Sequence, residues 1–228
     1  MNLLCGSFAV VAALMYNDLT LAFWLIVAGI VFDFFDGFVA RLLHSPSAIG
    51  VQLDSLADVI TSGLAPAAVL WQVCLQTEPC WLPEAWKLGY GVFVLAAFSA
   101  LRLAKFNIDE TQTVEFCGLP TPAGSLLCAS LGMLWQQGML ALSSDGVLLI
   151  AVLTSLLLVS PIRMFALKFH GFGWRGNEVR YLFLLASIVL IIILRTYAIP
   201  VIIVLYIVVS AVRWLCMRSG NPDKAPKA

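Results

Sequence analysis

The chain is organised around two neighbouring acidic segments, Asp33-Phe34-Phe35-Asp36-Gly37-Phe38-Val39-Ala40-Arg41 and Gly50-Val51-Gln52-Leu53-Asp54-Ser55-Leu56-Ala57-Asp58. Both lie in stretches whose other residues would suit a lipid bilayer. An ionised carboxylate at the centre of a membrane helix costs about 2.5 kcal/mol or more, so such a residue usually has a function. The four aspartates are therefore the first candidates for functional residues.

On helices, these aspartates form two pairs. Asp33 and Asp36 are three residues apart and Asp54 and Asp58 are four apart, so each pair occupies one helix face. Carboxylates that face one another repel strongly, and they either share protons or bind cations. Oxygen ligands suit hard ions such as Mg²⁺, Mn²⁺ or Ca²⁺ rather than structural zinc. A simpler interpretation, headgroup-level acids neutralised by Arg41, leaves the accompanying glycines unexplained.

The composition is that of a polytopic membrane protein. Of 228 residues, 61% are hydrophobic and only 11% are charged, whereas soluble domains have about 25% charged residues. The net charge is zero, so the total charge indicates no nucleic-acid partner. The six cysteines have no metal-binding spacing, and most should be apolar packing residues. Cys74 and Cys80 flank a loop and could pair if that loop is extracytoplasmic.

We expect an all-α bundle of about eight transmembrane helices, because a span needs about 20 apolar residues. One transmembrane catalytic domain would cover residues 1–218. Residues 219–228 are polar and should form a flexible cytoplasmic tail. The predicted spans are residues 2–16, 19–43, 50–74, 86–106, 121–142, 146–168, 179–195 and 197–217.

The distribution of cations predicts the orientation in the membrane. If eight spans alternate, Lys87 and Arg195 lie on one side and the remaining lysines and arginines lie on the other. Positive residues concentrate on the cytoplasmic side, so both termini and the acidic segments should be cytoplasmic. The residues on that side are Arg41, Arg102, Lys105, Arg163, Lys168, Arg175, Arg180, Arg213, Arg218, Lys224 and Lys227.

The acidic segments resemble the signature of the CDP-alcohol phosphatidyltransferase family, Asp-x2-Asp-Gly-x2-Ala-Arg-x8-Gly-x3-Asp-x3-Asp. All eight positions are matched, by Asp33, Asp36, Gly37, Ala40, Arg41, Gly50, Asp54 and Asp58. The resemblance implies a core of six transmembrane helices, followed here by two C-terminal helices. It also implies an enzyme that uses two divalent ions, Mg²⁺ or Mn²⁺ and possibly Ca²⁺.

A second region points to one branch of that family. Arg102-Leu103-Ala104-Lys105-Phe106-Asn107 and Gly118-Leu119-Pro120-Thr121-Pro122-Ala123 are similar to segments of the phosphatidylserine synthase branch. Lys105 stands where that branch usually has arginine, and a lysine would hold a carboxylate less rigidly. Without the resemblance, Arg102 and Lys105 could equally be cations that anchor the cytoplasmic end of a helix.

The resemblance implies a role for each candidate residue. Asp33, Asp36, Asp54 and Asp58 would hold the metal ions, and Asp58 would also be the general base. Gly37, Ala40 and Gly50 would leave room for the nucleotide, Arg41 would bind the diphosphate, and Ser47 would contact the nucleotide lipid. The candidates for binding the serine carboxylate and its surroundings are Arg102, Lys105, Asn107 and Arg163.

The implied reaction transfers the phosphatidyl group of CDP-diacylglycerol to the hydroxyl of L-serine and releases CMP. The resemblance also implies a homodimer in the inner or cell membrane of a prokaryote, in contact with membrane lipids. One alternative is the same transfer to glycerol 3-phosphate, inositol or choline. A rival of a different class is a cation transporter, which should show acids near the bilayer midplane and repeated broken helices. The sequence shows no such repeat.

Overall fold

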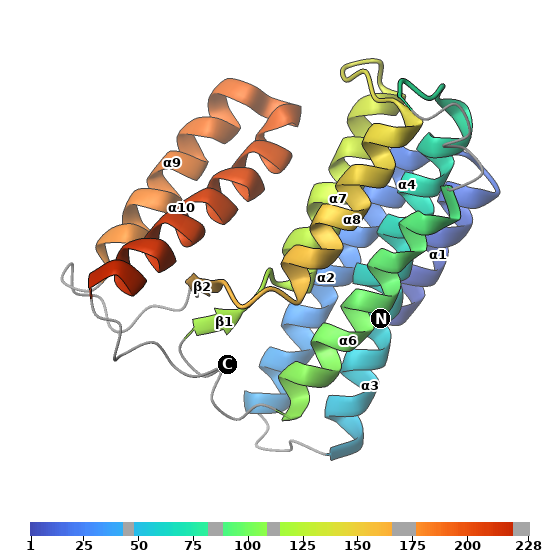
Figure 1. Cartoon of the computed structure of the whole chain (residues 1–228). Helices are drawn as coiled ribbons and strands as arrows, with labels where there is room; N and C mark the ends of the chain where they lie inside the picture. The colour runs from blue at the N-terminus through green and yellow to red at the C-terminus, as the bar shows by residue number, and fades with distance from the viewer. Residues whose placement is uncertain (43–47, 82–88, 109–114, 166–176, 221–228) are drawn as a thin grey trace.

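In the computed structural model, residues 1–42, 48–81, 89–108, 115–165 and 177–220 are described, and they are mostly helical (Figure 1). The elements are α1 (Asn2–Leu14), α2 (Leu19–Leu42), α3 (Ala48–Asp58), the π-helix η1 (Val59–Leu64), α4 (Ala65–Gln76), the 3₁₀-helix η2 (Gly89–Phe93), α6 (Val94–Ile108), β1 (Glu115–Cys117), α7 (Thr121–Gln136), α8 (Ser144–Leu158), β2 (Arg163–Phe165), α9 (Glu178–Leu194), η3 (Arg195–Tyr197) and α10 (Ala198–Gly220).

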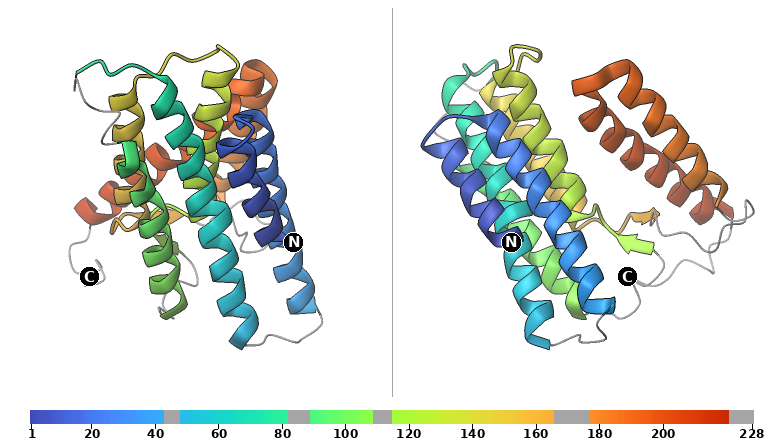
Figure 2. Two further views of the ribbon diagram at one scale, coloured as in Figure 1. Left: turned by 90° about the vertical axis from the view of Figure 1, so that its right-hand side faces the viewer. Right: turned by 180° about the vertical axis from the view of Figure 1, so that it is seen from behind.

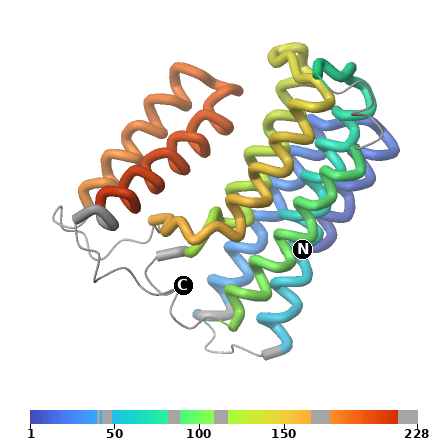
Figure 3. The backbone as a smooth tube through the Cα atoms, viewed as in Figure 1, coloured from blue at the N-terminus to red at the C-terminus, as the bar shows by residue number. Residues whose placement is uncertain are grey.

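The helices divide into a main bundle and a C-terminal hairpin. Helices α1, α2, α6, α7 and α8 run beside a continuous rod made of α3, η1 and α4 (Figures 1 and 3). Helices α9 and α10 form an antiparallel hairpin that lies beside this bundle (Figure 2). Helix α10 contacts α7 and strand β2. The ends of α2, α3 and α6 project beyond the other helices on the side where the chain begins (Figure 1).

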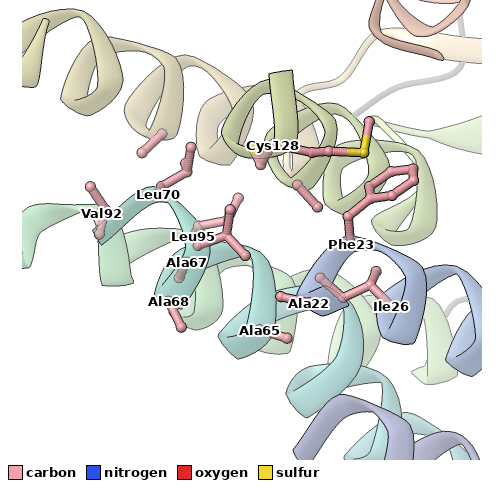
Figure 4. Close-up of a cluster of buried hydrophobic side chains, with 14 of the residues drawn as sticks. Ala22, Phe23, Ile26, Ala65, Ala67, Ala68, Leu70, Val92, Leu95 and Cys128 are labelled. Atoms are coloured by element: carbon pink, nitrogen blue, oxygen red, sulfur yellow. The ribbon is translucent and has the colours of Figure 1, made fainter. Parts of the chain in front are cut away.

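Many alanines lie in the core of the bundle, among larger apolar side chains. Ala22, Phe23 and Ile26 of α2 meet Ala65 of α4 and Cys128 of α7 in one buried cluster (Figure 4). Small residues let membrane helices approach closely, and this packing replaces the hydrophobic driving force that is weak within lipid. The close packing fixes where α2 and the α3–α4 rod lie relative to each other.

Length and hydropathy support an integral membrane protein. Four helical stretches of the described chain could cross a membrane: Leu19–Val39, Ile49–Gln76, Gly89–Ile108 and Glu178–Cys216. Asn2–Leu14 and Ser144–Leu158 are apolar but shorter. Large apolar side chains are exposed along α9, as a lipid-facing surface would require. The expected total of eight transmembrane helices stays a prediction.

Two predicted spans are wrong at their C-terminal ends. The span expected over 146–168 ends at Leu158, and Arg163–Phe165 forms strand β2 instead, antiparallel to β1. Pro161 explains the break, because proline disfavours helical geometry at the residue before it and cannot donate a backbone hydrogen bond. The span expected over 121–142 ends at Gln136, where Gly138 turns the chain with φ of 69°.

The possible pairing of Cys74 with Cys80 is not seen, and the C-terminal tail begins later than expected. Cys74 is buried, Cys80 is exposed, and neither forms a disulfide. Helix α10 continues through Ser219 and Gly220, two residues that we expected in the tail. Residues 221–228 lie outside the described part of the chain.

Gly118 provides a test of the close packing between the segment that precedes α7 and the end of α8. Its N–H donates to the carbonyl of Ile162 at 2.9 Å, its φ is 76°, and an added Cβ would lie 2.9 Å from the carbonyl carbon of Leu158. Gly138 also has positive φ, but a Cβ there would meet open space. The two glycines therefore separate backbone strain from steric overlap.

We predict that Gly138→Ala lowers the stability by about 1–2 kcal/mol, the cost of a left-handed backbone with a Cβ. Gly118→Ala should lower it by about 1–3 kcal/mol more, because the new methyl group has no space. Thermal unfolding of both variants in the same detergent measures the difference. Equal losses of stability would contradict the packing of Gly118 against α8.

Candidate active site

Two aspartates of the site lie on the projecting end of α2. Asp33 is half-buried and Asp36 is exposed, and the helix continues past both to Leu42. An added Cβ at Gly37 would meet nothing within 4 Å. The glycine beside the aspartates therefore borders open space.

Helix α3 brings a third carboxylate to this place. One oxygen from each of Asp33, Asp36 and Asp54 lies within 4.8 Å of the others. Oxygen ligands of Mg²⁺ and Ca²⁺ lie at about 2.0–2.6 Å from the ion, so two ligands of one ion are at most about 4–5 Å apart. The three carboxylates thus fit a hard divalent cation in both chemistry and spacing.

Asp58 occupies a different position, at the junction of α3 with the π-helix. Its Oδ1 accepts a hydrogen bond from Asn2 Nδ2 at 2.9 Å, and the same nitrogen donates to Asp33 Oδ1 at 3.0 Å. The structure therefore brings Asp58 beside Asp33 but through an amide, and it groups only the other three aspartates as a possible metal site. Sequence analysis did not find this role of Asn2.

The π-helix follows Asp58 directly and packs tightly against α1. Single π-turns within α-helices are often found at functional sites. Thr61, in the π-helix, is buried and donates its hydroxyl to the backbone oxygen of Asn2 at 3.1 Å. A Cβ added at Gly6 would lie 2.8 Å from Thr61 Cα, so only glycine permits this approach.

Arg102 of α6 is a buried cation whose charge acts on Asp58. It is buried, its charge interacts with that of Asp58, and its Nη1 donates to Thr121 Oγ1 at 3.5 Å. Its guanidinium also lies 5.9 Å from the ring centre of Phe106. Its Nε has no hydrogen-bond partner among the described residues. A buried guanidinium with a donor to spare can bind an anionic group.

The C-terminal hairpin reaches the neighbourhood of Arg102. The charge of Arg102 acts on Tyr206 of α10, a residue that sequence analysis did not single out. Tyr206 is buried, its hydroxyl donates to the carbonyl of Phe165 at 2.9 Å, and its ring packs against Phe165 and Phe183. Only the three-dimensional packing brings α10 to this place, since more than 100 residues separate 102 from 206 in the chain.

The other candidates for acceptor binding are more scattered. Asn107 is exposed and donates to Ser55 Oγ at 2.8 Å, which links the end of α6 to α3. Lys105 is exposed near the end of α6. Arg163 lies on strand β2 in register with Cys117, rather than in a helix as expected.

The remaining nucleotide candidates are only partly described. Ala40 and Arg41 belong to the last turn of α2, but their side chains lie outside what the structure describes. Ser47 lies outside the described residues altogether. Gly50 is in α3, one turn before Asp54 and on the same side of the helix.

Comparison with known proteins supports the family resemblance of the acidic segments. The family model of CDP-alcohol phosphatidyltransferase matches residues 1–160, which end just after α8. The chain is 33% identical to the CDP-diacylglycerol–serine O-phosphatidyltransferase of Bacillus subtilis over 75% of this chain and 88% of the relative. It is 31% identical to that of Helicobacter pylori strain 26695, over 86% and 80% of the two chains.

A third relative extends the similarity through the C-terminal hairpin. The CDP-diacylglycerol–serine O-phosphatidyltransferase of Mycobacterium tuberculosis strain H37Rv is 32% identical over 98% of this chain and 81% of the relative. The match of the family model, the eight signature residues and the grouped carboxylates agree with one another. This chain therefore belongs to the CDP-alcohol phosphatidyltransferase family.

Proposed function

We propose that the protein transfers the phosphatidyl group of CDP-diacylglycerol to the hydroxyl of L-serine, giving phosphatidylserine and CMP. The observation that carries the proposal is the gathering of Asp33, Asp36 and Asp54 at one end of the bundle, beside Asp58 and the buried Arg102. The relatives named CDP-diacylglycerol–serine O-phosphatidyltransferase, which match most of the chain, support serine as the acceptor.

The carboxylates address the main difficulty of the reaction, which is the negative charge of the diphosphate. Asp33, Asp36 and Asp54 would be the principal ligands of two divalent ions, Mg²⁺ or Mn²⁺, and Asp58 would complete the second site. Bound ions of this kind neutralise the phosphates, orient them and stabilise the charge of the departing nucleotide. The three carboxylates belong to two helices held by the core, so their arrangement precedes substrate binding.

Asp58 would be the general base. It accepts the proton of the serine hydroxyl while the hydroxyl oxygen forms a bond to the phosphorus of the phosphatidyl group. The bond between that phosphorus and the oxygen of CMP breaks, and CMP leaves with the electron pair. The support for this role is that Asp58 stands apart from the three grouped carboxylates and beside Arg102.

Arg102 would bind the carboxylate of serine. It is buried and its charge interacts with that of Asp58, so a carboxylate bound to its guanidinium could place the serine hydroxyl on the side of the proposed base. Lys105 and Arg163 are further candidates for this carboxylate, and Asn107 could serve as a polar partner. The exposure of Lys105 favours Arg102 as the stronger contact.

The donor would lie along the projecting ends of α2 and α3. The open space at Gly37 supports binding of the cytidine and ribose there, with Ala40 and Gly50 on the same helices. Arg41 would bind the diphosphate and Ser47 the nucleotide lipid. The acyl chains would remain in the bilayer beside the apolar outer faces of the helices.

The setting of the reaction follows from the same proposal. One catalytic domain over residues 1–218, with eight spans, would place the site and both termini on the cytoplasmic side of a prokaryotic membrane. The excess of lysine and arginine on that side supports this orientation. A homodimer stays a prediction from the resemblance. Membership of a transferase family argues against the cation transporter.

The direct test measures CMP release by the purified protein in lipid nanodiscs that contain CDP-diacylglycerol and Mn²⁺ or Mg²⁺. We expect L-serine to release CMP well above the rate of hydrolysis, because Arg102 can bind its carboxylate. Glycerol 3-phosphate, inositol and choline should do so poorly, and the lipid product with serine should be phosphatidylserine. Faster CMP release with one of the other three alcohols would contradict the assignment of the acceptor.

Replacement of Asp58 tests the proposed base. Asp58→Asn keeps the size of the side chain but removes the proton acceptor, so kcat should fall by about 10²–10⁴-fold. The elution volume of the variant on size exclusion in detergent should match that of the unchanged protein. A variant with full turnover would remove Asp58 from the mechanism.

Replacement of Arg102 tests the acceptor site. Arg102→Ala should raise the KM for serine by about tenfold or more, equivalent to about 1.4 kcal/mol or more of lost binding. The KM for CDP-diacylglycerol should change much less, because the donor is bound by other residues. Lys105→Ala should have a weaker effect on serine. Equal effects of Arg102→Ala on both substrates would refute the assignment.

A further inference from the structure

Asn2 lies at the start of α1, where it joins the two acidic helices. It is only 3% exposed, and its Nδ2 donates both of its hydrogens, one to Asp33 Oδ1 at 3.0 Å and one to Asp58 Oδ1 at 2.9 Å. The two aspartates come from different helices. A single amide group therefore bridges carboxylates from both helices.

The position of Asn2 is itself fixed by the packing of α1 against the π-helix. Thr61 Oγ1 donates to the backbone oxygen of Asn2 at 3.1 Å. A Cβ at Gly29 would lie 2.6 Å from Thr61 Cγ2 and 3.2 Å from Asn2 Oδ1, so α2 also closes on this point. Helix α1 cannot slide along its neighbours without losing these contacts.

The electrostatics fix the orientation of the amide. If its oxygen and nitrogen were exchanged, the oxygen would face two carboxylate oxygens and be repelled by both. In the observed orientation, Asn2 Oδ1 is buried without a hydrogen-bond partner among the described residues. An unpaired buried polar atom costs about 1–3 kcal/mol. The same side chain that leaves its oxygen unpaired donates two hydrogen bonds through its nitrogen, to Asp33 and Asp58.

We propose that Asn2 is a positioning residue, which holds Asp33 as a metal ligand and keeps Asp58 oriented as the base. Its hydrogen bonds occupy one oxygen of each carboxylate and leave the other outside the bond. As a neutral group, it separates the two acids without adding charge. This inference rests on the proposed function, in which Asp33 binds an ion and Asp58 receives a proton.

The experiment compares Asn2→Ala with Asn17→Ala in the full chain, tagged at its C-terminus so that the start of α1 is unaltered. Asn17 is a matched control, because its side chain exchanges hydrogen bonds with Gln76 of α4 at the opposite end of α1. The measurements are binding of Mn²⁺ to the substrate-free protein, by electron paramagnetic resonance, and the kinetic constants for serine.

We expect Asn2→Ala to weaken Mn²⁺ binding about tenfold to a hundredfold, as the loss of a group that orients a ligand does. At saturating Mn²⁺, kcat should still be reduced, because Asp58 has lost its orientation, while the KM for serine should change little. Asn17→Ala should leave Mn²⁺ binding unchanged. Thr61→Val, which releases Asn2 without altering it, should change the same constants in the same direction but less, and it serves if Asn2→Ala does not fold.

Two results would overturn the inference. One is unchanged Mn²⁺ affinity and kcat in Asn2→Ala, and the other is an equal loss in Asn17→Ala, which would mean that looser packing of α1 is the cause. Asp36→Ala distinguishes this failure from that of the proposed function, since Asp36 belongs to the metal site but Asn2 donates its amide hydrogens to Asp33 and Asp58. If Asp36→Ala loses Mn²⁺ but Asn2→Ala does not, only the positioning role fails. If Asp36→Ala retains Mn²⁺ fully, the metal site fails.

Discussion

Repulsion among four carboxylates is the constraint on which the rest of this structure depends. An acid at the centre of a membrane helix costs about 2.5–3.5 kcal/mol even before like charges approach one another. Here three carboxylates from two helices share a space less than 5 Å across. Such an arrangement favours compensation of its charge, and hard divalent cations can provide that compensation with oxygen ligands alone.

The bundle holds the acids together through features that are remote from the chemistry. Alanines and glycines let α1, α2 and the α3–α4 rod approach closely. The π-helix continues the rod beyond Asp58 and presents Thr61 to the start of α1. The amide of Asn2 donates a hydrogen bond to Asp58, and the charge of the buried Arg102 acts on the same carboxylate. The strength of the site therefore depends on helix packing as well as on its ligands.

Much of this could be predicted from the sequence, because the eight signature residues have fixed spacing and hydrophobic segments of span length are easy to recognise. The pairing of Asp33 with Asp36 follows from helix periodicity alone. The role of Asn2 and the packing of Tyr206 could not be found in that way, since both depend on contacts with residues far away in the chain. The end of α8 was missed because hydropathy continues past Pro161, whereas backbone geometry stops the helix there.

The central claim is that the carboxylates of α2 and α3 converge on metal ions. A crystal structure grown with Mn²⁺, with anomalous differences recorded at the manganese absorption edge, tests it most directly. The account predicts anomalous peaks at about 2.0–2.6 Å from carboxylate oxygens of Asp33, Asp36 and Asp54. Manganese bound elsewhere on the protein, with these three side chains turned away from one another, would contradict it.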